Sequence, residues 1–345
     1  MGTEKKGLIY VNDSFPGYGR RKHARGFIYF DEKQIKLTDK AELKRLKELR
    51  IPPAWKKVWI CKSPHGYLQA TGYDDRERKQ YLYHTEWSEF SLYEKFGKLL
   101  DFGKALPGIR QEIEKNLQRP AWDRIKVLSL VLKLMDEKHM RVGNKAYERE
   151  NETYGVTTIR RKHLKETGNR LLIQFRGKSG KQRSISINDE QLKKLVKESS
   201  ELPGYEIFRF IDEKGDSNTV DSADVNAFLQ QISRQDFTSK TFRTWGGTVL
   251  AVEEWQEAKR IVQKDSRKKL KTTIVREVAR KLGNTISVAE QYYIHPYVLK
   301  KLSDKEFKHN MAGDEHFSSK QKQYLDKAER LTLYLLEKEQ DAPAK

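Results

Sequence analysis

Cysteine is almost absent from this chain of 345 residues, because Cys61 is the only one. A single cysteine excludes an internal disulfide and a zinc site built from several cysteines. Long apolar runs are also missing: no stretch approaches the roughly 18 to 20 residues that a membrane-spanning helix needs. The first six residues lack the apolar core of a signal peptide, and Lys6 stands where a myristoylation motif requires serine or threonine. We therefore expect a soluble, cytoplasmic protein with no membrane partner.

Acidic residues are outnumbered, and this imbalance points to a polyanionic partner. The chain holds 69 Lys and Arg against 49 Asp and Glu, which gives a formal net charge of +20. A charge of this size favours nucleic acid, although a basic ribosome-associated or merely soluble protein would also carry it. Aromatic residues make up 10% of the chain, and this content argues against a disordered basic tail. The length suggests about two domains.

The N-terminal part reads as a small β-rich domain. Strands are predicted at 26–30, 58–61 and 67–71, the last two around a turn at 63–66, with a short helix at 41–49 that Pro52 and Pro53 end. Basic residues alternate with glutamine and tyrosine over 74–84, a mixture that suits phosphates and base edges. The alternative for this segment is a solvated charged loop followed by core tyrosines.

The rest of the chain is predicted to be mostly helical. Apolar spacing indicates helices at 92–100 and 109–117, separated by Gly103 and Pro107, and further helices at 121–140, 189–196, 221–232, 272–282 and 318–338. Alternating residues at 171–175 and 183–187 predict a β-hairpin. The fold class is therefore α+β. We divide the chain into a β-rich domain at 1–90, a helical domain at 91–316 and a helical tail at 317–345.

The tip of the predicted hairpin carries Gly177-Lys178-Ser179, which resembles the end of a nucleotide-binding P-loop. The full P-loop pattern requires a glycine at position 172, where leucine stands, and a helix after the motif, where a strand is predicted. The P-loop interpretation therefore fails. We expect no nucleotide cofactor.

Cationic residues at element ends are candidates for binding a phosphate. Arg141 follows the apolar helix at 121–140, and Lys240 and Arg243 open a later one. Cations at a helix start oppose the helix dipole, so a bound phosphate there would relieve a local conflict. Downstream, Asn284 precedes the pair Tyr292-Tyr293, and a tyrosine is a plausible nucleophile toward a phosphodiester.

These residues resemble the type IB DNA topoisomerases in their short bacterial and poxvirus-like form. The resemblance covers most of the chain. The motifs that carry it are Ile51-Pro52-Pro53-Ala54-Trp55, Leu68-Gln69-Ala70-Thr71-Gly72, Arg78–His84, Arg141-Val142-Gly143-Asn144, Tyr154–Thr158, Gly177–Lys181, Phe242-Arg243-Thr244-Trp245 and Leu282-Gly283-Asn284-Thr285. Each motif alone is weak, but their common order along the chain is specific.

The resemblance implies an enzyme that relaxes supercoiled DNA through a 3′-phosphotyrosyl intermediate. It places the catalytic set on Arg141, Lys178, Arg243, Asn284 and Tyr293, with Lys178 as the general acid. It places DNA contacts on Gln80, Tyr81, Tyr83, Tyr147 and Lys240, and it implies a C-shaped clamp around double-stranded DNA. Poxviral members carry histidine where Asn284 stands, so asparagine suggests a bacterial, nucleoid-associated enzyme. We expect a monomer that requires neither metal nor ATP.

Three alternatives stay open at this point. Tyr292 and Tyr297 compete with Tyr293 for the role of nucleophile, and only the family spacing selects Tyr293. A tyrosine recombinase or integrase uses similar chemistry, although such proteins usually carry a His-x-x-Arg motif that is lacking before Arg243. A noncatalytic basic DNA-binding protein would explain the charge but not the spaced polar residues.

Overall fold

The computed structural model describes residues 7–24, 26–304, 306–307 and 314–341. The chain divides between Lys95 and Phe96 into two units, which we treat separately. This division lies five residues after the end of the β-rich domain predicted at 1–90. Helix α2 (Thr85–Gly97) contains the dividing point.

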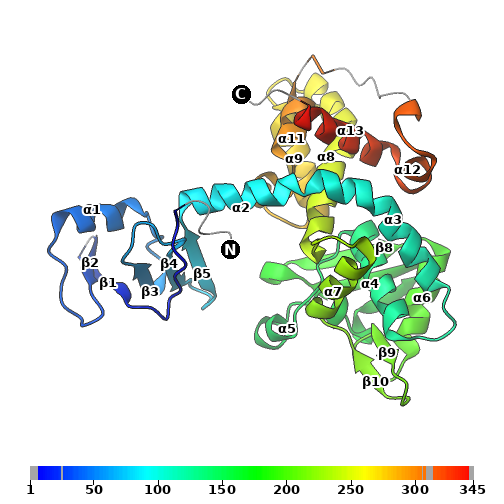
Figure 1. Ribbon diagram of the computed structural model, residues 1–345, viewed down its shortest axis with the longest axis horizontal. Coiled ribbons are helices and arrows are strands. Elements are labelled where there is room, and N and C mark those ends of the chain that lie inside the picture. Colours follow the sequence, from blue (N-terminus) through cyan, green and yellow to red (C-terminus); the bar gives the residue numbers. More distant parts are fainter. Residues whose placement is uncertain (1–6, 25, 305, 308–313, 342–345) are drawn as a thin grey trace. The chain divides into compact units, whose positions relative to one another are not determined.

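The first unit is built on one antiparallel sheet whose strands follow the order β2-β1-β3-β4-β5 (Figure 1). The elements are β1 (Gly17–His23), β2 (Gly26–Phe30), α1 (Lys40–Glu48), β3 (Lys56–Cys61), β4 (Leu68–Tyr73) and β5 (Lys79–Tyr83). The predicted strands at 26–30, 58–61 and 67–71 and the predicted helix at 41–49 are confirmed. β1 and β5 were not predicted as strands, because their charged residues hide the alternation. β5 forms an edge of the sheet, so one side of its backbone is unpaired within it.

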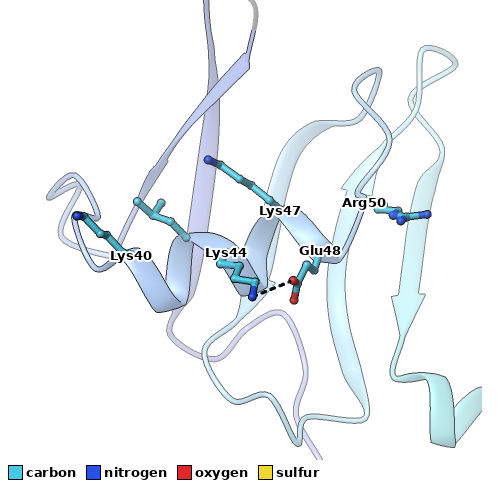
Figure 2. A pocket seen from close by; sticks show the side chains of 6 residues that line it. Lys40, Lys44, Lys47, Glu48 and Arg50 are labelled. Atoms are coloured by element: carbon cyan, nitrogen blue, oxygen red, sulfur yellow. Dashed lines mark ion pairs between the residues drawn. The ribbon is translucent and has the colours of Figure 1, made fainter.

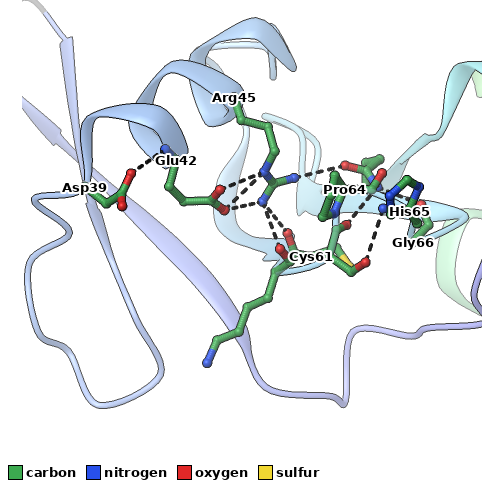
Figure 3. A network of polar contacts seen from close by, with 10 residues as sticks. Asp39, Glu42, Arg45, Cys61, Pro64, His65 and Gly66 are labelled. Atoms are coloured by element: carbon green, nitrogen blue, oxygen red, sulfur yellow. Dashed lines mark hydrogen bonds and ion pairs between the residues drawn. The ribbon is translucent and has the colours of Figure 1, made fainter.

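Helix α1 supplies the centre of the small core in this unit. Leu46 is 1% exposed and packs with Ile60 and Ala70, both fully buried, from β3 and β4. The neighbouring Arg45 fastens the helix to the loop after β3: it pairs with Glu42 and donates hydrogen bonds to the carbonyl of Cys61 and to Gln69 (Figure 3). The ion pair with Glu42 and the hydrogen bonds to Cys61 and Gln69 explain how this nine-residue helix, which has four basic residues, stays packed on the sheet.

The second unit is mostly helical, as predicted. Its helices are α3 (Leu99–Leu117), α4 (Arg124–Lys138), α5 (Lys145–Asn151), α6 (Glu190–Glu201), α7 (Ser222–Ser233), α8 (Ser239–Lys264), α9 (Leu270–Leu282), α10 (Ile286–Tyr292), α11 (Pro296–Ser303), α12 (Ser319–Tyr324) and α13 (Lys327–Gln340). Its strands are β6 (Leu164–Thr167), β7 (Arg170–Arg176) and β8 (Gln182–Ile187), which form one sheet, and the short pair β9 (Arg209–Ile211) and β10 (Ser217–Thr219).

Helix α8 is the central element of this unit. It contacts α3, α4, α7, α9, α11 and α13. Its first half is buried continuously from Phe242 to Val252, including the polar residues Arg243, Thr244 and Thr248. A helix that is buried all round holds its side chains in fixed positions, which makes it a rigid support for a functional group.

The predicted break at Gly103 and Pro107 is wrong. Helix α3 runs without interruption from Leu99 to Leu117 and contains both residues. A Cβ atom at position 103 would lie 2.5 Å from the ring of Trp245, so glycine is needed here for close packing of α3 on α8. Burial of Leu99, Leu106, Ile109 and Ile113 outweighs the cost of the interior proline.

The tail predicted to be helical at 318–338 is helical, but the structure divides it into two helices. Helix α12 ends at Tyr324, and Asp326 begins α13 by accepting a hydrogen bond from the backbone N–H of Glu329. An aspartate that caps a new helix must leave helical geometry itself. The predicted apolar stripe is therefore split between two helices.

The predicted hairpin is confirmed and extended. Strands β7 and β8 pair in antiparallel register from Leu171 opposite Ile187 to Arg176 opposite Gln182, and β6 adds a third strand beside β7. Residues 177–181 form the tip, where the N–H of Gly177 donates to the carbonyl of Lys181. Within the described part of the chain, no helix is long and apolar enough to cross a membrane.

Candidate active site

The C-terminal end of α4 delivers Arg141. Val127, Leu130 and Leu134 are fully buried in the core, and the helix ends at His139, whose backbone is left-handed (φ 50°). The carbonyl of Arg141 accepts a hydrogen bond from the N–H of Val156 at 2.8 Å. The loop around Arg141 is thus fixed by the core on one side and by a second backbone segment on the other.

That second segment approaches so closely that two glycines are required. A Cβ atom on Gly155 would lie 2.5 Å from the Cα of Gly143 and 2.6 Å from the carbonyl oxygen of Arg141. Gly143 also has a φ of +101°, a region that other residues rarely adopt. The motifs 141–144 and 154–158 therefore form one packed substructure, and this contact explains why both carry a glycine.

Arg243 lies on the first turns of α8 and is only 4% exposed. Its guanidinium donates to the carbonyl of His139, to the carbonyl of Leu282 at 3.2 Å and to Asn284 Oδ1 at 3.0 Å. These acceptors come from the ends of α4 and α9. Arg243 therefore joins three helices at the point where the catalytic residues were predicted to lie.

Asn284 is the meeting point of the two predicted arginines. Helix α9 ends at Gly283 in a left-handed conformation (φ 65°), and Asn284 follows directly. Its Oδ1 accepts from Arg141 Nη2 at 2.8 Å and from Arg243 Nη2 at 3.0 Å. Both bonds use the oxygen, which leaves the amide nitrogen as the group able to donate to a bound phosphate.

Tyr293 follows α10 and reaches the same place. The Cζ atom of Arg243 lies 5.0 Å from the centroid of the Tyr293 ring. Gly247 on α8 allows this approach, since a Cβ there would lie 2.5 Å from the carbonyl oxygen of Tyr293. Thr248 donates from its hydroxyl toward the same carbonyl at 3.4 Å. The nucleophile candidate is therefore fixed by α8, the helix that also carries Arg243.

The other two tyrosines are placed differently. Tyr292 is 42% exposed and ends α10. Tyr297 lies on α11, which Pro296 begins, and its ring faces Lys301 at 5.5 Å. Tyr293 and Tyr297 therefore do not share a helix face, because Pro296 starts a separate helix.

Lys178 lies at the hairpin tip and is exposed. The structure places it around the same small pocket as Arg141 and Arg243. It has no hydrogen bond or ion pair with another described residue, so its side chain is available to a ligand. Lys240, one turn before Arg243 on α8, is also exposed.

Arg183 is a basic residue of this pocket that the sequence did not single out. It lies on β8, and its Nη2 donates to the carbonyl of Lys281 at 3.2 Å. Burial and then the charge of Arg141 lower the pKa of Arg183. The sequence offered one signal: Arg183 lies five residues after Lys178, on the strand that leads away from the hairpin tip.

The positive charges of this pocket are not balanced by acidic side chains among the described residues. Burial, followed by the charge of Arg141, lowers the pKa of Arg243 to about 10, so it remains charged at neutral pH. Burial and the charge of Arg243 lower the pKa of His139 to about 4, so this histidine is neutral. Within the described ranges, no carboxylate forms an ion pair with Arg141, Arg183 or Arg243. Clustered guanidiniums without a counter-charge suit an anion such as a phosphate.

The remaining predicted DNA contacts lie mostly in the first unit. Gln80, Tyr81 and Tyr83 are on the edge strand β5, and the tyrosines are 50% and 41% exposed with stacked rings 6.2 Å apart. The core-tyrosine alternative for this segment is therefore wrong. Gln80 donates to Asp74 Oδ2 at 3.0 Å. Tyr147 belongs to α5 by its backbone, but its side chain lies outside the described residues.

A second basic hollow lies on α1, apart from the predicted site residues. Lys40, Leu43, Lys44, Lys47, Glu48 and Arg50 line it (Figure 2). Lys44 faces Glu48 at 4.0 Å, and both side chains are mostly exposed. This is a solvated charged helix face rather than an enclosed pocket. No group of three or more potential metal ligands occurs among the residues that the structure describes.

A set of arginines, of which Arg243 is buried, lies around an asparagine and a tyrosine with a lysine at the pocket, and this set suits chemistry at a phosphodiester. Comparison with known proteins identifies the family. Residues 85–320 match the eukaryotic DNA topoisomerase I catalytic core, and residues 26–74 match the bacterial DNA topoisomerase IB N-terminal domain. The chain belongs to the type IB DNA topoisomerases and is an enzyme of the isomerase class.

Relatives agree with this assignment. The chain is 32% identical over 290 residues to DNA topoisomerase 1B of Acanthamoeba polyphaga mimivirus, covering 82% of this chain and 86% of the relative. It is 25% identical over 245 residues to DNA topoisomerase 1B of Vaccinia virus (strain Copenhagen), covering 68% and 73%. A solved complex of the XerH site-specific recombinase aligns at 15% identity over 64% of this chain and 55% of the recombinase chain, with a TM-score of only 0.33.

Proposed function

We propose that this enzyme relaxes double-stranded DNA by using Tyr293 as the nucleophile and Arg141, Lys178, Arg243 and Asn284 to activate the scissile phosphate. One observation carries the proposal: Arg141 and Arg243 meet on Asn284 Oδ1, and Arg243 also lies against the Tyr293 ring. Residues from four separate segments thus surround one position, where an anion would offset their charge.

The reaction begins when the Tyr293 oxygen attacks the phosphorus. A bond forms from that oxygen to phosphorus, and the bond from phosphorus to the 5′ oxygen breaks. Lys178 gives a proton to the departing 5′ oxygen, which is otherwise a poor leaving group. The phenol proton passes to solvent. The products are a 3′-phosphotyrosine and a free 5′-hydroxyl, and the covalent bond conserves the energy needed to reverse the step without ATP.

The guanidiniums supply electrostatic stabilisation. Arg141 and Arg243 hold the nonbridging oxygens, on which negative charge gathers in the transition state. Asn284 Nδ2 adds a neutral donor, since its oxygen is already used by the two arginines. This arrangement needs no metal ion, because fixed cations provide the charge that a metal would otherwise provide.

The first unit supplies the grip on the duplex. Tyr81 and Tyr83 are exposed along β5, and Gln80 lies partly buried between Lys79 and Tyr81 on the same strand. Lys240 and Tyr147 are the contacts that we propose in the second unit. We infer that the two units close around DNA as a C-shaped clamp, and that the enzyme works as a cytoplasmic, nucleoid-associated monomer of bacterial type. Strand rotation between cleavage and religation then removes supercoils.

Plasmid relaxation without metal or ATP tests the activity. Wild type is expected to relax a supercoiled plasmid in EDTA, and Tyr293→Phe is expected to bind it without relaxing it. Tyr292→Phe is the matched control, because it removes the neighbouring hydroxyl and should keep activity. Strand exchange restricted to defined sites would instead establish a recombinase, and binding without nicking by wild type would establish a noncatalytic DNA-binding protein.

A further inference from the structure

We infer that Arg183 binds a DNA phosphate next to the scissile one and thereby positions the strand for cleavage. This inference rests on the proposed function of the site. Arg183 is half-buried on β8 and lines the pocket that also contains Arg141, Lys178 and Arg243.

The position of the Arg183 side chain is fixed from both sides. A Cβ atom on Gly283 would lie 2.1 Å from Arg183 Nη1, and a Cβ on Gly177 would lie 3.0 Å from Arg183 Cγ. Its Nη2 donates to the carbonyl of Lys281 at 3.2 Å. The Arg183 side chain therefore lies between two glycines: its stem contacts Gly177, and its guanidinium contacts Gly283.

The charge of Arg183 has no partner that explains it. Burial and the nearby charge of Arg141 both oppose its ionised form. Its acceptor is the neutral carbonyl of Lys281, and within the described ranges no Asp or Glu forms an ion pair with it. A partly buried cation without a counter-ion is stabilised when an anion binds.

The scissile phosphate is already served by other donors. Under the proposed mechanism, its two nonbridging oxygens accept hydrogen bonds from Arg141, Arg243 and the amide nitrogen of Asn284. Arg183 lines the same pocket from the hairpin that carries Lys178. A neighbouring phosphate of the same strand, one step or about 3.4 Å further along the duplex axis, is then the anion that we assign to Arg183.

Two variants separate charge from local structure. Arg183→Gln removes the charge while keeping a donor for the Lys281 carbonyl, and Arg183→Lys keeps the charge. Arg170→Gln is the matched control, because Arg170 is an exposed arginine at the far end of β7, on the same sheet. We expect Arg183→Gln to slow single-turnover cleavage roughly 10- to 100-fold, Arg183→Lys to recover part of the rate, and Arg170→Gln to have no effect.

Salt dependence gives a readout that a merely structural role would not change. Binding is measured on a duplex in the Tyr293→Phe background at several salt concentrations. Arg183→Gln is expected to reduce the slope of log K against log salt by about 0.9, the value for one lost phosphate contact. An unchanged slope together with slow cleavage would overturn the inference and assign Arg183 to holding the Lys281 carbonyl.

Duplexes with one methylphosphonate locate the contact. Neutralising the contacted neighbouring phosphate should slow wild type, and Arg183→Gln should show no further loss on that substrate. If the methylphosphonate and Arg183→Gln slow cleavage additively at every neighbouring position, the inference is contradicted. If the variants fail to fold, wild type alone decides: sensitivity only at the scissile phosphate would also contradict the inference. Cleavage of unmodified DNA by wild type tests the proposed function separately, so failure of one proposal is distinguishable from failure of the other.

Discussion

Two arginine clusters in the second unit differ in how their charge is balanced. Arg110 on α3 lies between Asp136 on α4 and Glu329 on α13, with four nitrogen-to-oxygen contacts of 2.6 to 3.0 Å. Trp245 on α8 completes this cluster by donating to Glu329 at 3.2 Å. In the candidate active site, by contrast, Arg141, Arg183 and Arg243 face neutral oxygens.

The two clusters share helices α4 and α8 but have opposite effects on the arginine pKa. The two carboxylates outweigh burial and raise the pKa of Arg110, whereas burial and mutual repulsion lower the pKa of Arg243 to about 10. The balanced cluster holds the fold together. In the unbalanced cluster the arginine charges repel one another, and under the proposed function a bound phosphate would relieve this repulsion.

Removing Arg110 should have the largest effect on stability. Arg110→Ala leaves Asp136 and Glu329 buried without their cation, and we expect it to lower the free energy of unfolding by about 3–5 kcal/mol. Lys115→Ala on the same helix is the control, since that side chain is 74% exposed. Urea unfolding measures both. A loss below about 1 kcal/mol for Arg110→Ala would show that the contrast between the clusters is wrong.

Removing Arg141 should have the reverse profile. Arg141→Met takes one cation from the unbalanced cluster, while Asn284 Oδ1 still accepts from Arg243. We expect cleavage to slow by about 10²–10³-fold, as for one lost transition-state donor, with unfolding free energy equal to wild type or higher. Single-turnover cleavage and urea unfolding provide the two measurements. A large loss of stability would mean that Arg141 supports the fold rather than the reaction.

An added anion should stabilise only the unbalanced cluster. Inorganic phosphate at 100 times its dissociation constant is expected to stabilise wild type by about 2.7 kcal/mol. Arg110→Ala should keep this gain, and Arg141→Met should lose most of it. Thermal unfolding in phosphate and in chloride at equal ionic strength makes the comparison. Equal gains in all three proteins would indicate a general salt effect instead of a bound anion.

Mild acid should weaken the protein first through its buried histidines, including the one at the site. The pKa of His139 is about 4 in the folded protein, against about 6.5 when unfolded. The unfolded chain therefore binds more protons between these values, and stability falls as pH drops below 6.5. Hydrogen bonds from Arg110 outweigh burial and lower the pKa of Glu329, so its contribution is lost only below its ordinary value near 4.5.

The variant His139→Asn isolates this contribution, because asparagine tolerates the left-handed backbone at position 139. His163 and His295 also have pKa values of about 4 and contribute with the same sign. We expect the loss of unfolding free energy between pH 7 and 5.5 to be about 1 kcal/mol smaller in the variant. Identical pH profiles for variant and wild type would remove His139 from this account.

The sequence predicted local features well where one residue type determines them. The hairpin and the helix predicted at 272–282 both follow from short-range chemistry, and the structure confirms them. The break at Gly103 failed because packing against Trp245 is a long-range contact. The same limit applies to the tail, where the apolar stripe does not reveal that Asp326 starts a new helix.

The residues of the candidate site were chosen from the family pattern. Arg141, Lys178 and Arg243 line one pocket, and Arg141 and Arg243 both donate to Asn284. The roles of Arg141, Lys178, Arg243, Asn284 and Tyr293 remain predictions. What the sequence could not give is the pairing of Arg141 and Arg243 on one oxygen, or the place of Arg183. Both depend on the spatial arrangement of the ends of α4 and α9 with the starts of β8 and α8. A linear motif contains no information on that arrangement.

Mapping the covalent adduct shows directly whether Tyr293 is the nucleophile. Wild type is trapped on a duplex whose 5′ leaving strand is short enough to dissociate after cleavage, digested with protease and analysed by peptide mass spectrometry. We expect a nucleotide attached to Tyr293, and no adduct in Tyr293→Phe while Tyr292→Phe forms it normally. An adduct on Tyr292 or Tyr297, or an undiminished adduct in Tyr293→Phe, would contradict this expectation.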